Sequence, residues 1–138
     1  MRMVLDSSVS LAWVLPDGLQ DNEKRIREDY RKRIHECLAP EIFLGENANA
    51  LIKAERRKTI QFGMAHPLLL DILSTQPVFH PFAPLVASAM SLASKTGAGF
   101  FDCAYLILAA REKCEFVTAD IRTVNALSGF PVSHLSTF

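Results

Sequence analysis

The first indication of the fold is a short stretch near the N-terminus, Met3-Val4-Leu5-Asp6-Ser7-Ser8. Its three apolar residues are typical of a short buried strand, and an acidic residue follows them at once. A similar order recurs in Glu115-Phe116-Val117-Thr118, which is followed two residues later by Asp120. In an open parallel sheet, ligands bind beyond the carboxyl ends of the strands. We therefore expect Asp6 and Asp120 at the same edge of such a sheet.

Outward from these stretches, helical and extended segments alternate along the chain. Apolar spacing, prolines and glycines predict helices over residues 9–15, 21–37, 43–58, 67–74, 84–94, 102–113 and 120–127. The other expected strands cover residues 77–80 and 132–135, and a turn is expected at Pro16-Asp17-Gly18. No two strands are joined by a tight hairpin turn. This pattern favours an α/β domain with a mostly parallel sheet covered by helices.

Length and charge limit the possible classes of protein. The 138 residues fit a single domain over residues 1–138, because chains of this size bury enough surface to fold alone. The 15 lysines and arginines balance 15 aspartates and glutamates, so the formal net charge is zero. This balance argues against a protein that holds nucleic acid mainly by bulk attraction. Any nucleic-acid function must depend on local patches and a specific site.

The cysteines and the apolar pattern indicate the cellular setting. There are three cysteines and no C-x-x-C pair, which is typical of free thiols in a reducing, intracellular compartment. The first apolar run ends at Asp6, which is too early for a signal peptide. No stretch approaches the roughly 18 consecutive apolar residues of a membrane span. We therefore expect a soluble cytoplasmic protein that does not enter the membrane.

Four acidic side chains form the candidate site: Asp6, Glu46, Asp102 and Asp120. Each has a simpler structural explanation. Asp6 fits a helix cap, and Asp102 and Asp120 favour a helix N-terminus electrostatically. Glu46 fits a solvent-facing position near the start of a long helix. Taken singly, none of these acids establishes a site.

The neighbours of two of these acids favour a functional role. Asp102 precedes residues 103–110, an almost wholly apolar helix that must be buried, and Glu46 lies among small residues that let a helix pack closely. Burying a lone charge is costly, so converging acids need a cation. Carboxylate oxygens without histidine or cysteine suit Mg²⁺ or Mn²⁺ rather than zinc.

Four acidic blocks follow one another along the chain. They are Leu5-Asp6-Ser7-Ser8-Val9, Gly45-Glu46-Asn47-Ala48-Asn49-Ala50-Leu51, Phe101-Asp102-Cys103-Ala104-Tyr105-Leu106 and Val117-Thr118-Ala119-Asp120. Together they resemble the acidic blocks of PIN-domain nucleases, and in particular those of the VapC-type toxins of bacterial and archaeal toxin–antitoxin pairs. The resemblance covers essentially the whole chain, in the family's order and at its usual length.

The resemblance implies a three-layer domain in which helices enclose a five-stranded, mostly parallel sheet. It implies a pocket for one or two Mg²⁺ or Mn²⁺ ions and endonucleolytic cleavage of RNA, often transfer RNA or another structured RNA. It also implies a homodimer and a cognate antitoxin protein as partner. By position, Asp6, Glu46, Asp102 and Asp120 carry over as catalytic metal ligands. Ser8 and Thr118 carry over as hydroxyls that support those carboxylates or the bound water.

Two positions depart from the family's pattern. Gly99 lies three residues before Asp102, where threonine or serine is frequent, so a capping hydroxyl is missing. Gly45 precedes Glu46, where a bulky residue is common. Neither change removes an acid.

Basic residues gather in two clusters, and either cluster is a candidate for contact with RNA phosphates. One cluster comprises Lys24, Arg25, Arg27, Arg31, Lys32 and Arg33, and the other Lys53, Arg56, Arg57 and Lys58. The simpler interpretation is a solvated helix face on which neighbouring acids such as Glu28 and Glu55 pair with the cations.

Other protein classes also place acids at the ends of parallel strands. A phosphoacceptor receiver domain needs an acidic pair after the first strand and a lysine after the last, and both are missing. A haloacid-dehalogenase-like phosphatase needs a second aspartate two residues after Asp6, where Ser8 stands. The alternative that stays open is a PIN-like binding or scaffold module without catalytic turnover.

Overall fold

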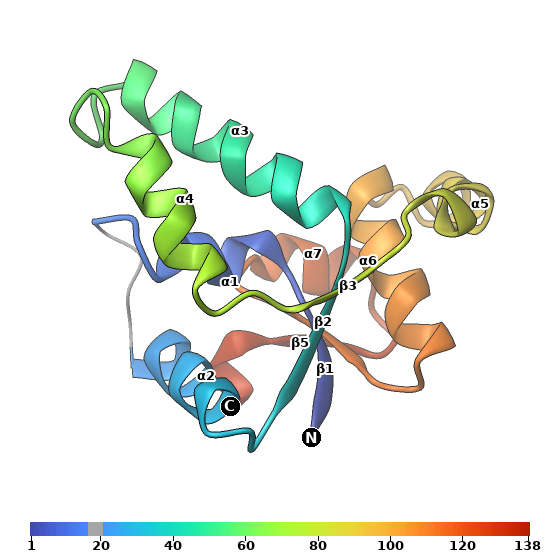
Figure 1. Cartoon of the computed structure of the whole chain (residues 1–138). Helices are drawn as coiled ribbons and strands as arrows, with labels where there is room; N and C mark the ends of the chain where they lie inside the picture. Colours follow the sequence, from blue (N-terminus) through green and yellow to red (C-terminus); the bar gives the residue numbers. More distant parts are fainter. Residues whose placement is uncertain (17–20) are drawn as a thin grey trace.

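Five parallel strands form one sheet in residues 1–16 and 21–138, the part of the chain that this computed structural model describes (Figure 1). The strands are β1 (Arg2–Leu5), β2 (Glu36–Pro40), β3 (Val78–His80), β4 (Glu115–Thr118) and β5 (Val132–His134), in the order β3-β2-β1-β4-β5. Every pairing is parallel, and Val4 of the central β1 lies opposite Leu38 of β2 and Phe116 of β4. All the carboxyl ends therefore face one edge. The predicted α/β class and parallel sheet are confirmed.

Helices follow the strands along the chain. They are α1 (Ser7–Ala12), α2 (Asp21–Arg31), α3 (Ile42–Arg56), α4 (Ala65–Leu73), α5 (Val86–Thr96), α6 (Phe100–Arg111) and α7 (Ile121–Ala126), with short 3₁₀ turns at Ala83–Leu85 and Leu135–Thr137. Pro84, expected at the first position of a helix, lies in the 3₁₀ turn that leads into α5. Most predicted helices thus exist, with ends shifted by a few residues, as is usual for helix boundaries.

The sheet separates two apolar cores, because successive side chains of a strand point to opposite faces. Val4 packs into one core with Leu51 of α3 and Leu106 of α6. Met3 and Leu5 pack into the other core, which α1 and α2 cover. Figure 1 shows α3 and α4 side by side as one long helical pair and α2 on the other side of the sheet. The expected three-layer arrangement is therefore present.

The predicted helix over residues 21–37 is wrong in its last third. The helix α2 ends at Arg31, and Arg33 has a φ angle of 61°, a left-handed conformation that ends the helical path. The next residues enter β2, where Cys37 pairs with Met3 of β1. Ile34, which the predicted helix would place four residues after Tyr30 on its apolar face, is 54% exposed. As strand β2, residues 37–40 are buried between β1 and β3. This burial of apolar side chains outweighs the extension of a charged, solvent-exposed helix.

The turn expected at Pro16-Asp17-Gly18 falls on residues that include 17 and 18, which lie outside the described ranges.

Among the described helices, none is both long and apolar enough to cross a membrane.

Candidate active site

Asp6 lies at the carboxyl end of β1, where its backbone N–H donates to the Val117 carbonyl of β4 at 3.0 Å. Its side chain is only 6% exposed. The hydroxyls of Ser8 and Thr118 each donate a hydrogen bond of 2.7 Å to Oδ2 of Asp6. Burial raises the pKa of Asp6, and the two hydroxyl hydrogen bonds partly offset this rise. Both residues expected to support the site thus contact this carboxylate.

Glu46 lies in the early turns of α3 and faces α6. The Tyr105 hydroxyl donates a hydrogen bond of 2.6 Å to Oε1 of Glu46. Burial raises the pKa of Glu46 to about 7, and the negative charges of Asp6 and Asp102 add to the rise that the tyrosine hydrogen bond opposes. Glu46 is therefore not a solvated helix residue, because it belongs to the same cluster of acids as Asp6.

Asp102 lies in the first turn of α6. Its Oδ2 accepts a hydrogen bond of 3.2 Å from the Thr123 hydroxyl of α7. Burial raises the pKa of Asp102, and so does the charge of Asp6. Gly99 occupies the N-cap of α6 without a side-chain cap, as its sequence implied. A Cβ at Gly99 would lie 3.3 Å from Oδ2 of Asp102. The missing side chain therefore lets this carboxylate lie close to the backbone of residue 99.

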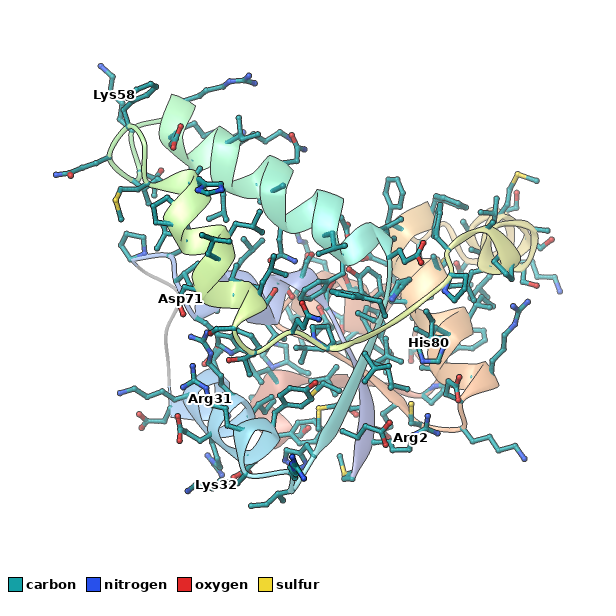
Figure 2. The ribbon with its side chains drawn as sticks, in the orientation of Figure 1. Arg2, Arg31, Lys32, Lys58, Asp71 and His80 are labelled. Atoms are coloured by element: carbon teal, nitrogen blue, oxygen red, sulfur yellow. The ribbon has the colours of Figure 1, made fainter. Side chains whose placement is uncertain are left out.

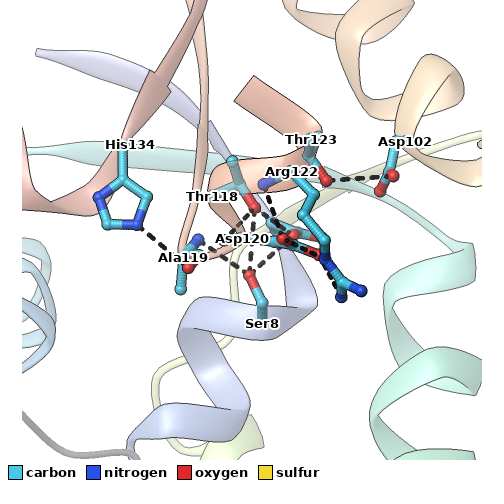
Figure 3. A network of polar contacts seen from close by, with 9 residues as sticks. Ser8, Asp102, Thr118, Ala119, Asp120, Arg122, Thr123 and His134 are labelled. Carbon is cyan, nitrogen blue, oxygen red and sulfur yellow. Dashed lines mark hydrogen bonds and ion pairs between the residues drawn. The ribbon is translucent and has the colours of Figure 1, made fainter. Parts of the chain in front are cut away.

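Asp120 differs from the other acids because it has a cationic partner. It occupies the N-cap of α7, where Oδ1 accepts from the Arg122 backbone N–H at 2.9 Å. The Arg122 guanidinium also donates to both oxygens, each at 3.1 Å (Figure 3). The Arg122 hydrogen bond holds the pKa of Asp120 below its ordinary value. Asp120 therefore lies at a helix N-terminus, as expected, and this place coexists with a position beside Asp6. Asp6, for which a cap was the simpler explanation, occupies the N-cap of α1 without a capping side-chain hydrogen bond.

The four acids lie close enough to influence one another electrostatically. Asp6 raises the pKa of Glu46 and that of Asp102, and Asp120 raises the pKa of Asp6. Burial and mutual repulsion make this end of the sheet unfavourable for full ionisation. A divalent cation relieves that kind of charge accumulation. The all-oxygen donor set therefore fits a hard cation such as Mg²⁺ or Mn²⁺.

The carboxylates do not form a ready-made cage. Within residues 1–16 and 21–138, no three acidic, histidine or cysteine side chains are arranged to hold a metal ion as they now lie. Hydrogen bonds with Tyr105, Thr123 and Arg122 hold individual carboxylates. The four carboxylates are thus of the right type and in the right region for a cation. Their present side-chain positions do not yet form its coordination sphere.

Three residues of the site escaped the sequence analysis: Tyr105, Thr123 and Arg122. Tyr105 is fully buried in the apolar helix α6, where a phenolic hydroxyl needs a hydrogen-bond partner. Its position three residues after Asp102 places it near the same face of that helix. Thr123 stands in the same relation to Asp120. These spacings are signals that sequence reasoning had available, whereas the pairing of Arg122 with Asp120 is a side-chain choice on an exposed turn.

The fold and the site together define an α/β protein with a hydroxyl-supported cluster of acids at the carboxyl ends of β1 and β4. Residues 3–126 match the family model of the PIN domain. The chain belongs to the PIN domain family, a family of nucleases that generally use divalent metal ions. A search of curated protein sequences found no match to the chain.

Solved structures share the fold at low sequence identity. A chain of the crystal structure of PAE2754 from Pyrobaculum aerophilum is 19% identical with a TM-score of 0.74, and the match covers 99% of this chain and 85% of that one. A chain of the crystal structure of VapBC2 from Rickettsia felis, bound to a DNA fragment from the VapBC2 promoter, is 13% identical with a TM-score of 0.67. The match covers 97% of this chain and 98% of that one. For FitAcB from Neisseria gonorrhoeae the values are 13%, 0.62, 99% and 99%.

Proposed function

We propose that this protein is a metal-dependent endoribonuclease that hydrolyses phosphodiester bonds of RNA at Asp6, Glu46, Asp102 and Asp120. The observation that carries the proposal is the convergence of these acids from β1, α3, α6 and the end of β4 into one cluster. Within this cluster the pKa values of Asp6, Glu46 and Asp102 are raised. An ordinary structural acid is paired or solvated, so three partly buried carboxylates that repel one another indicate a site for a cation.

Asp6 and Asp102 are the proposed direct ligands of Mg²⁺ or Mn²⁺, and Glu46 and Asp120 complete the set directly or through water. When bound, such an ion neutralises the carboxylates, makes water a better nucleophile and stabilises the charge that builds on the phosphate. Without this reversal of charge, the carboxylates would repel the RNA backbone.

The surrounding hydroxyls position the acids. Ser8 and Thr118 fix Oδ2 of Asp6, and Thr123 fixes Oδ2 of Asp102. Tyr105 orients Glu46 from inside the core. Because water is the proposed nucleophile, the RNA 2′-hydroxyl takes no part in the bond cleavage. We expect products with 5′-phosphate and 3′-hydroxyl ends.

A toxin of a toxin–antitoxin pair is the proposed biological role, with a homodimer in the cytoplasm as its form. Two observations support it: the four acidic blocks resemble those of VapC-type toxins, and the fold is similar to chains of VapBC2 and FitAcB. A cognate antitoxin is accordingly the proposed protein partner. Transfer RNA or another structured RNA is the proposed substrate.

The proposal is tested by incubating total cellular RNA with the purified protein in Mn²⁺, in EDTA, and with Asp6→Asn in Mn²⁺. Asp21→Asn, a change at an exposed aspartate at the start of α2, is the matched control. We expect discrete fragments with the parent protein and the control, and none with EDTA or Asp6→Asn. Intact RNA in every lane, or cleavage that survives EDTA and Asp6→Asn, would favour the non-catalytic binding module. Thermal stabilisation by Mn²⁺ distinguishes a competent site from a dismantled one.

A further inference from the structure

The far end of the α3–α4 pair carries cations and an exposed aromatic ring. We call Arg56, Arg57, Lys58 and Phe62 the α3–α4 tip. Phe62 is 96% exposed, and all three cations are exposed as well. Figure 2 shows Lys58 at the extreme end of this helical pair, where side chains extend away from the body of the protein. Such exposure of a phenylalanine is unfavourable in isolation, because the ring stays in water.

The cations of the tip have no acidic partner within 4.0 Å in residues 1–16 and 21–138. The sequence had suggested that Glu55 pairs with them. Glu55 instead accepts hydrogen bonds from the backbone N–H groups of Gly63 and Ala65, at 3.1 and 2.7 Å, and so closes the loop. The cations thus lie on a solvated face, as the simpler interpretation expects, but Glu55 does not pair with them.

The basic cluster on α2 provides a contrast. Arg27 forms an ion pair of 2.8 Å with Asp71, and Arg31 forms one of 3.1 Å with Glu28. Arg27 also lies over the Trp13 ring, with 4.8 Å between its Cζ atom and the ring centroid. These arginines hold α2 against the rest of the molecule. Among the residues that the structure describes, two of the six cations of this cluster thus form ion pairs, whereas none of the three cations of the tip does.

Two open hollows share Thr59 in their linings, one at the tip and one beside Ser8. One hollow of about 510 Å³ is lined by Arg56, Lys58, Thr59 and Phe62. Thr59 also lines a second hollow of about 410 Å³, which extends to Ser8, the residue that holds Asp6. Ten residue steps separate Glu46 from Arg56 at the end of α3, which corresponds to ~15 Å at the usual helical rise. A strand only a few nucleotides long is sufficient to span this path.

The chemistry of the tip fits an unpaired nucleic-acid strand. Proteins that hold single strands combine cations along the backbone with aromatic rings on which bases stack. Only an unpaired base offers a free face to Phe62, since the bases of a duplex are stacked on one another. The zero net charge of the chain also requires that attraction to RNA come from a local patch.

We propose that the α3–α4 tip binds an unpaired segment of the RNA strand that is cut at the acids, with Phe62 stacked on a base and Arg56, Arg57 and Lys58 at phosphates. This inference rests on the proposed ribonuclease function and adds to it a second contact surface for the same RNA strand, away from the cleavage position. The strand follows the two hollows past Thr59 and Ser8.

The test measures the affinity of a fluorescent single-stranded RNA in Mn²⁺ for the Asp6→Asn protein, which keeps the RNA intact. Phe62→Leu and Arg57→Gln are added to it separately. Lys58 is left unchanged, because its φ angle of 61° makes any substitution there a change of backbone strain too. Phe130→Leu and Lys32→Gln are the matched controls. Phe130 is a 43% exposed ring that precedes the edge strand β5, far along the chain from the tip.

We expect Phe62→Leu to weaken single-strand binding by about tenfold, as loss of one base–aromatic stack does. Arg57→Gln should reduce the slope of log affinity against log salt by about 0.7, the value for one phosphate contact on a single strand. The controls should bind as the parent does. A duplex of the same sequence should bind more weakly and should not respond to Phe62→Leu.

The other outcomes separate this inference from the function on which it rests. If the unmutated protein cleaves RNA in Mn²⁺ and Phe62→Leu leaves the affinity unchanged, the tip is not a strand-binding surface and the ribonuclease proposal stands. If RNA is neither bound nor cleaved, both are overturned. If light scattering finds that Phe62→Leu converts a dimer into monomers, the tip is a protein–protein contact, which overturns the inference.

Discussion

The Tyr105 hydroxyl donates to Oε1 of Glu46 at 2.6 Å and thereby joins α6 to α3 across the acid cluster. The tyrosine ring stacks on Phe116 of β4, with the ring centroids 5.4 Å apart and the planes 15° apart. A single side chain thus connects the packing of the core with the position of an acid. The site is held by the interior of the protein rather than by surface loops alone.

Tyr105→Phe keeps the stacked ring and removes only the hydrogen bond to Glu46. Because the hydroxyl is buried and its partner is a carboxyl group, we expect the free energy of unfolding to fall by about 1–3 kcal/mol. The pKa of Glu46 should rise further, since the lost hydrogen bond lowers it. Urea denaturation measures the first effect. Tyr30→Phe removes a comparable hydrogen bond, from Tyr30 to the Gln76 carbonyl, at an exposed position and should cost less. Equal losses in both variants would contradict a special role for the Glu46 contact.

Glu46 should make the metal-free protein less stable as pH rises. Its pKa is about 7 in the folded state against 4.5 ordinarily, so the folded protein holds a proton that the unfolded chain has released between these values. The free energy of unfolding therefore falls between about pH 4.5 and 7. Asp6 and Asp102 act in the same direction, because their pKa values are also raised. Denaturation in EDTA at pH 5, 6, 7 and 8 measures the slope. Glu46→Gln should flatten it, and a slope that persists unchanged would exclude Glu46 as its source.

Thr118→Val tests whether the hydroxyls of the site position Asp6. The side chain is fully buried, and its Oγ1 both donates to Asp6 and accepts from the Asp120 backbone N–H at 3.1 Å. The substitution leaves the Asp120 N–H without this acceptor and Asp6 with the Ser8 hydroxyl alone, which should cost about 1–3 kcal/mol of unfolding free energy. The stabilisation gained on adding Mn²⁺ should also shrink, which a purely structural role would not produce. Thr118→Ser retains the hydroxyl and should restore both. A valine variant as stable as the parent, with the full stabilisation by Mn²⁺, would contradict a positioning role for the Thr118 hydroxyl.

Arg122→Gln should strengthen the binding of a divalent cation. The guanidinium occupies both oxygens of Asp120, although the arginine side chain itself is 88% exposed. An exposed ion pair contributes little to stability, so the fold should be unaffected and Mn²⁺ affinity should rise by roughly two- to fivefold. Calorimetric titration with Mn²⁺ measures the change, and Arg122→Lys should give an intermediate value. Weaker binding by the glutamine variant would indicate that Arg122 positions Asp120 for the ion.

Residue patterns were sufficient for most of the fold, and β2 shows where they fail. Apolar residues recur at every fourth position from Ile26 in α2 through Ile34 to Leu38. Residues 32–37 therefore resembled the continuation of a helical face. Residues 36–40 form a strand because β1 and β3 pair with them on either side. The local spacing of apolar residues carries no information about such tertiary neighbours. The fifth strand of the sheet was expected from the family resemblance alone.

The acids of the site were predictable because strand ends converge in a parallel sheet. Their partners were less so. Tyr105 and Thr123 depend on how α6 and α7 pack against neighbouring acids, which is a tertiary property. Whether Glu55 pairs with arginines or closes a loop likewise depends on the turn that follows α3. The local charge pattern predicted that Glu55 pairs with the arginines. In the structure, its carboxylate instead accepts hydrogen bonds from the backbone N–H groups of residues 63 and 65.

The strand order gives the site a place in time as well as in space. The first acid, Asp6, follows a strand that is completed only when a segment more than a hundred residues later pairs beside it. On the ribosome, β1 must therefore wait until β4 has been made before Asp6 meets Thr118 and Asp120. Contacts so distant in sequence form late and slowly. The acid cluster can therefore form only after β4 and Asp120 have been synthesised.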